Sequence, residues 1–153
     1  MKLHFDILRI TRKNIIEDIK GLSLDQLNKT PEGMNNNIAW NLGHLVATQQ
    51  LLVYGLSRNL FVVPKSIIVE NKIGTGPEKI YSQEEIDTFC EYLLSNIDRM
   101  EKDYNEGVLN SDNFKTYTTS YNITLSSVEE SIIFNNIHEG MHYGIIKMIM
   151  KLV

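Results

Sequence analysis

The stretch Ser131–Met150, SIIFNNIHEGMHYGIIKMIM, carries two histidines one helical turn apart, His138 and His142. Each residue of an α-helix turns the chain by about 100°, so a spacing of four leaves the second imidazole only about 40° from the first. Phe134 and Ile145 fall on the same side, which is therefore apolar and expected to face the protein interior. The stretch predicts a packed helix that directs two imidazoles inward.

A third histidine, His44, lies in a second amphipathic stretch, Asn37–Leu45 (NIAWNLGHL), where Trp40 shares its side. Buried imidazoles need partners for their nitrogens, because a buried polar group without one costs about 1–3 kcal/mol. Two interpretations stay open: the three histidines bind one divalent metal ion between two helices, or they are separately hydrogen-bonded core residues. The fourth histidine, His4, is expected at the end of the bundle, without a metal role.

The composition is that of an ordinary globular domain, with 153 residues, 42% of them hydrophobic, and a formal net charge of −4. No long run of basic residues suggests nucleic-acid binding. No segment approaches the roughly 18 apolar residues of a membrane span, and residues 1–14 lack a signal-peptide core. The single cysteine, Cys90, is typical of a reducing compartment and is expected in the core. We therefore expect one cytoplasmic domain over residues 1–153, with no nucleic-acid or membrane partner.

Four segments have the apolar spacing of amphipathic helices, at about residues 2–20, 37–57, 82–105 and 126–153. Ser82 with Glu85, and Ser126 with Glu129, match the capping box that begins a helix. Four long helices joined by two long connections predict an all-α four-helix bundle, with a long crossover between the second and third helices.

The crossover, residues 58–81, contains short Val and Ile runs that predict at most weakly paired strands. Gly43 lies inside the second helix, where glycine costs about 1 kcal/mol relative to alanine. We interpret it as allowing another helix to approach closely. The second long loop, residues 108–123, is rich in tyrosine and threonine, and it either covers a pocket or is pinned to the end of the bundle by Phe114 and Tyr117.

The segment His138–His142 also fits the His-Glu-x-x-His pattern of zinc peptidases, in which the glutamate is the general base. The extended form of that pattern needs a glycine and a further histidine where this chain has Ile145 and Met148. Glu139 lies about 100° from His138 around the helix, which predicts that it points sideways. A peptidase is therefore disfavoured.

Asn-x-x-Trp-x-x-Gly-His-Leu on a second helix, together with His-x-x-x-His on a fourth, resembles the DinB/YfiT-like superfamily of metalloenzymes, and the likeness covers nearly the whole chain. The resemblance implies an up-down-down-up bundle, a divalent metal ion held by His44, His138 and His142, and frequent dimerisation. Activities in this superfamily include thiol transfer by bacillithiol transferases and a mycothiol-dependent isomerase. The chain departs at Ile145, where members often carry glutamine.

Three imidazoles leave a coordination position open on a metal ion, and zinc or nickel is the expected ion. We expect thiol-dependent transfer to a small electrophile rather than metal-dependent hydrolysis, because no carboxylate is predicted beside the histidines. The alternative is a non-catalytic helical module, with imidazoles more than about 5 Å apart. Trp40, Asn41, Thr48 and Tyr143 are candidates for shaping the site. A homodimer is expected, formed through the apolar residues of the first and third helices.

Overall fold

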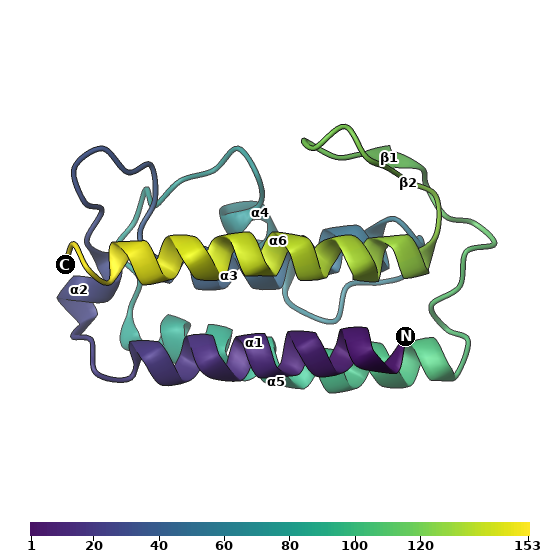
Figure 1. The fold of residues 1–153 in the computed structure, drawn as a ribbon, viewed down its shortest axis with the longest axis horizontal. Helices are drawn as coiled ribbons and strands as arrows, with labels where there is room; N and C mark the ends of the chain where they lie inside the picture. Colours follow the sequence, from purple (N-terminus) through teal and green to yellow (C-terminus); the bar gives the residue numbers. More distant parts are fainter.

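A computed structural model describes residues 1–153 and shows a bundle of four long helices (Figure 1). The long helices are α1 (Lys2–Ile19), α3 (Ile38–Gln49), α5 (Gln83–Asn105) and α6 (Val128–Ile149), and α3 continues directly into a π-helix, η1 (Gln50–Gly55). The shorter elements are α2 (Leu24–Asn28), α4 (Lys65–Asn71) and an antiparallel hairpin of β1 (Tyr117–Thr118) and β2 (Thr124–Leu125). In Figure 1, α1 and α6 run in one direction, and α3 and α5 run in the other. The predicted helical bundle is confirmed.

Serine side chains begin both α5 and α6. The capping box predicted for α5 is present, since Ser82 Oγ accepts from the Glu85 amide and Glu85 accepts from the Ser82 amide. Helix α6 begins one residue later than predicted, because Ser127 Oγ accepts from the Glu130 amide at 3.2 Å. The neighbouring Ser126 instead donates its amide to the Glu130 carboxylate. Two adjacent serines with acidic residues downstream leave this boundary ambiguous in the sequence.

The crossover differs from the expectation of weak strands. Its isoleucine-rich run forms helix α4 after Pro64, which buries Ile68 and Asn71. The predicted reason for Gly43 is confirmed, because a Cβ at this position would come within 2.5 Å of Asn71 Oδ1. Helix α4 packs against α3, and this close approach requires a residue without a side chain. The gain from burying Ile68 at this contact outweighs the β-propensity of the isolated run.

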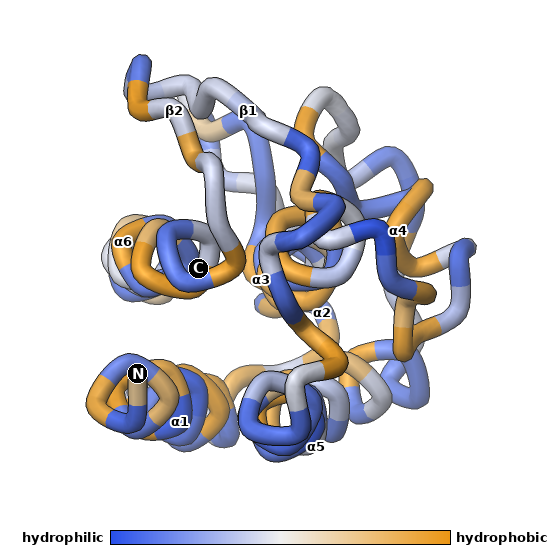
Figure 2. The backbone as a smooth tube through the Cα atoms, turned by 90° about the vertical axis from the view of Figure 1, so that its right-hand side faces the viewer, coloured by the Kyte–Doolittle hydropathy of each residue, from blue (hydrophilic) through white to orange (hydrophobic).

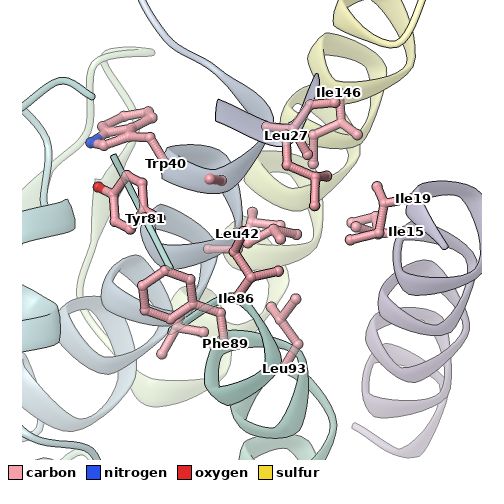
Figure 3. Close-up of a cluster of buried hydrophobic side chains, with 14 of the residues drawn as sticks. Ile15, Ile19, Leu27, Trp40, Leu42, Tyr81, Ile86, Phe89, Leu93 and Ile146 are labelled. Atoms are coloured by element: carbon pink, nitrogen blue, oxygen red, sulfur yellow. The ribbon is translucent and has the colours of Figure 1, made fainter. Parts of the chain in front are cut away.

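Two clusters of buried apolar side chains fill the bundle. The larger one, drawn in Figure 3, joins Ile15 of α1, Leu42 of α3, Leu93 of α5 and Ile146 of α6. The smaller one lies nearer the other end of the helices and includes residues such as Phe5, Leu52, Ile97 and Ile132. Both clusters draw on α1, α5 and α6, and the larger one is completed by α3 and the smaller one by its continuation η1, so the bundle is held together at two levels.

Large apolar side chains are exposed on α1 and α6. They are Leu3, Ile7 and Ile10 on α1, and Ile133, Ile137, Met141 and Met148 on α6. Figure 2 shows these two helices next to each other. Helix α5, the third long helix, has no exposed large apolar side chain. Of the two helices through which the dimer was expected to form, only α1 therefore presents such side chains, and the dimer itself remains a prediction. None of the helices combines the length and apolar character needed to cross a membrane.

Candidate metal centre

The three predicted histidines meet between α3 and α6. His44 extends from α3, and His138 and His142 from successive turns of α6. The Nε2 atoms of His44 and His138 are 3.2 Å apart, and one ring nitrogen of each of the three histidines lies within 4.8 Å of the others. The non-catalytic alternative expected imidazoles more than about 5 Å apart and hydrogen-bonded to separate carbonyl groups. The ring nitrogens are closer than that, whereas His44 and His142 do contact separate carbonyl oxygens.

Hydrogen bonds fix the orientation of two of the rings. The Nδ1 atom of His44 is 2.7 Å from the carbonyl oxygen of Asn71, and the Nδ1 atom of His142 is 2.7 Å from Oδ1 of Asn41. Because oxygen atoms of this kind only accept hydrogen bonds, each Nδ1 carries the proton and each Nε2 presents a lone pair. Metal-binding histidines are oriented in this way by their second nitrogen. The approach of α4 that Gly43 permits is therefore what supplies the Asn71 carbonyl to His44.

The arrangement fits a divalent ion. Metal–nitrogen bonds of about 2.0–2.1 Å in tetrahedral geometry place two ligand nitrogens roughly 3.3 Å apart, close to the 3.2 Å between His44 and His138. Without an ion, two lone pairs at this distance repel unless a proton lies between them. The Nδ1 atom of His138 is buried and has no hydrogen-bond partner, so His138 is the least restrained of the three rings.

Burial keeps the three imidazoles neutral. Removal from water lowers the pKa of His44, lowers that of His142 to about 4, and lowers that of His138 to about 2. The proximity of the other two histidines lowers the His138 pKa further, and so does the charge of Arg12. Imidazole must be neutral to bind a metal ion. At pH 7 the cluster is therefore in the protonation state that an ion requires.

A cavity of about 490 Å³ opens onto His44 and His138, with Thr48 beside them. Its walls are mainly apolar, and no aspartate or glutamate lines it. The hairpin loop lines this cavity and forms its roof, as one interpretation of residues 108–123 expected. Phe114 of the same loop packs against the smaller apolar cluster, as the other interpretation expected. Tyr121 ties this roof to α6, because its hydroxyl lies 3.1 Å from Met141 Sδ and its ring meets that of Phe134 edge-on.

The other candidates have different positions. Trp40 stacks on the His44 ring at 4.5 Å and an interplanar angle of 14°, so it orients that ligand. Tyr143 lies away from the cavity, where its hydroxyl donates to Asp18 of α1 at 2.7 Å. Cys90 is half-buried outside the cavity, and burial raises its pKa to about 11. Its thiol is thus protonated at neutral pH and is not a nucleophile.

Glu139 does not point sideways as predicted. It is fully buried, and the guanidinium of Arg12 donates to both of its carboxylate oxygens. Arg12 itself is fully buried on α1. The burial of Arg12 could have been inferred from the sequence, because Arg12 lies in the apolar stripe of α1, four residues after Leu8 and three before Ile15. A charge in such a stripe needs a buried partner, and Glu139 supplies it.

Comparisons with known proteins give one result for the family. Residues 7–146 match the sequence model of the DinB superfamily. The match begins in α1 and ends in α6, so it includes His44, His138, His142 and the cavity. No curated protein matches the chain.

Proposed function

The chain belongs to the DinB superfamily, and on this premise we propose that it is a metal-dependent enzyme that transfers a low-molecular-weight thiol to a small electrophile. The ligands are His44, His138 and His142, and the ion is zinc or nickel, both of which suit imidazole. When bound, a divalent ion lowers the pKa of a thiol or water that takes its open position. The oriented, neutral imidazoles on the cavity wall support this assignment.

The single observation that favours transfer over hydrolysis is the absence of a carboxylate from the cavity. A hydrolase needs a base positioned to direct its water, and the nearest glutamate along α6, Glu139, is bound to Arg12 inside the bundle. A thiolate is already a nucleophile and needs no such base. In the proposed reaction the sulfur forms a bond to an electrophilic carbon, the thiol proton passes to solvent, and the leaving group departs with the bonding electron pair.

The test compares thiols and hydrolysable substrates under the same conditions. Zinc- or nickel-loaded protein is assayed with cysteine and larger thiols plus 1-chloro-2,4-dinitrobenzene, and separately with p-nitrophenyl esters and anilides. We expect conjugation at least about tenfold above the uncatalysed rate, a modest requirement for an enzyme. The variant His138→Ala should lose this activity, whereas His4→Ala, a histidine outside the cavity, should keep it.

Three outcomes would contradict the proposal. Ester or amide cleavage that depends on His138, without acceleration of any thiol conjugation, would assign the site to a hydrolase. Absence of every activity in protein shown to contain the metal would favour a non-catalytic binding module. Activity unchanged in His138→Ala would place the chemistry outside this cluster.

We also propose that the chain forms a homodimer through the exposed apolar face of α1 and α6, which includes Leu3, Ile7 and Ile137. Exposed apolar patches of this kind commonly mark protein interfaces. Light scattering after size exclusion should give twice the chain mass of 17.6 kDa at micromolar concentration. The variant Ile7→Glu should shift the protein to the monomer mass, and a wild-type monomer would refute the proposal.

A further inference from the structure

The cavity has a long axis that follows α3 and η1. His44 and Thr48 lie at one end, and Gly55 and Leu56 at the other. At the helical rise of about 1.5 Å per residue, slightly less in a π-helix, His44 and Leu56 are separated by roughly 15–18 Å. A substrate that reaches the histidines can therefore extend far along the cavity.

Lys115 is placed at the end remote from the histidines. Its backbone amide donates to the carbonyl of Leu56 at 2.6 Å, which fixes it beside the last turn of η1. It lines the cavity, and its ammonium forms no ion pair with the chain. Apart from the histidines, it is the only basic residue in the lining, which contains no acidic residue.

The positive charge of Lys115 lies in a mainly apolar cavity of an acidic protein. Apolar side chains such as Leu52, Phe61 and Tyr117 line the same cavity. The chain as a whole is acidic, with a formal net charge of −4, so the ammonium is not part of a general basic surface. A cation at the end of an apolar channel is complementary to an anion attached to an apolar body.

We propose that the cavity binds amphiphilic anions, with the acidic group at Lys115 and the apolar body along η1. This deepens the proposed function by naming its electrophile class: an elongated apolar molecule with a carboxylate, sulfonate or phosphate remote from the reacting carbon. Only the placement of the reacting carbon at the histidines rests on the proposed function.

Two fluorescent probes that differ in one charged group test the proposal directly. They are 8-anilinonaphthalene-1-sulfonate and its uncharged parent, N-phenyl-1-naphthylamine, titrated into chelator-treated protein. The sulfonate should bind more tightly than the parent. The variant Lys115→Gln should weaken the sulfonate about fivefold, the upper end expected for one charge contact of an exposed lysine, and leave the parent unchanged.

Two further variants test whether the change in probe affinity is specific to Lys115 and whether the probes bind in the cavity. Lys13→Gln removes an exposed lysine of α1 that is outside the cavity and should change neither affinity. Met141→Trp narrows the cavity at a side chain that is 39% exposed, a position tolerant of a larger residue, and should weaken both probes. The proposal is supported if Lys115→Gln lowers the affinity for the sulfonate more than the affinity for the uncharged parent, and if the other two variants behave as expected.

The proposal is overturned if Lys115→Gln weakens both probes equally or neither, or if Met141→Trp leaves both unchanged. Because both probes are shorter than the cavity and are measured without metal, these results do not depend on thiol transfer. Failure of the activity assay with intact sulfonate selectivity would refute the reaction and leave the binding site standing. The reverse result would refute the amphiphilic anion alone.

Discussion

The double variant His44→Ala/His138→Ala should not bind the divalent ion that we expect the wild-type chain to bind, with a loss of affinity well above a hundredfold. Two of the three nitrogens that converge between α3 and α6 are removed, and the remaining His142 cannot hold an ion alone. Elemental analysis after dialysis against metal-free buffer should give up to about one ion per wild-type chain and almost none in the variant. Full occupancy in the double variant would refute the site.

The variant Asn41→Ala should have an intermediate effect on metal affinity in the same experiment. It keeps all three imidazoles and removes the oxygen that accepts from His142 Nδ1, together with an amide nitrogen that donates to Asn36 and to the Asn37 carbonyl at the start of α3. Loss of such an outer partner typically weakens metal binding 10–100-fold, so its affinity should lie between wild type and the double variant. Asn136→Ala is the matched control, because that side chain bonds only to the carbonyl of Ile132 in its own helix, and it should bind as wild type does.

The convergence of the histidines was predictable because it depends on local periodicity. The spacing of His138 and His142 sets their common direction within one helix, and the apolar neighbours of His44 set its direction in another. A helix turns in the same way whatever it packs against. The predicted cluster is confirmed for this reason, and metal binding by it remains a prediction.

Features that depend on contacts between distant segments were not predictable in the same way. The isoleucine-rich run of the crossover has strand propensity, yet α4 forms because Ile68 packs into the core and Asn71 fits against Gly43. The π-helix η1 lies where a continuous α-helix was expected, and the buried side chain of Gln50 there accepts from the amide of Val62. Such backbone adjustments are frequent near functional sites, and η1 lines the cavity.

The expected direction of Glu139 was wrong because it was inferred from the apolar residues of α6 alone, which mark only one face of the helix as buried. In a four-helix bundle α6 contacts both α1 and α3, so its buried surface is wider than one apolar stripe. Glu139 lies on the part of this surface that meets Arg12. Predicting the ion pair would have required comparing α1 with α6, because the arginine in the apolar stripe of α1 indicates that another helix supplies a buried carboxylate.

Arg12→Met is expected to destabilise the protein by about 3–5 kcal/mol, because it leaves the carboxylate of Glu139 buried without its counter-charge. The side chains of both residues are almost completely buried, at 0% and 1% exposure. One guanidinium joins all four long helices, since it also donates to Gln49 Oε1 of α3 at 3.1 Å and to the Leu93 carbonyl of α5 at 2.8 Å. Urea denaturation measures the loss.

Arg9→Met provides the control on the same helix. Arg9 also forms ion pairs, with Asp6, Asp98 and Glu101, but its side chain is 25% exposed. Surface pairs of this kind contribute about 0–1 kcal/mol. Equal losses in the two arginine variants would show that the buried pair has no special role.

The double variant Arg12→Met/Glu139→Leu separates the ion pair from the packing around it. Arg12 lies between the two apolar clusters, following Leu8 of one and preceding Ile15 of the other. Replacing a buried pair by apolar side chains of similar size is often neutral or stabilising, so this variant should recover most of the stability lost in Arg12→Met. If it does, the pair is not required for stability, and its proximity to His138, whose pKa the Arg12 charge lowers, becomes its distinguishing property. Metal affinity in the stable double variant then measures what this charge does. A positive charge that lowers the pKa of His138 also opposes a cation at that imidazole, so the expected result is an affinity no weaker than wild type, and a weaker one would show that the pair positions the histidine.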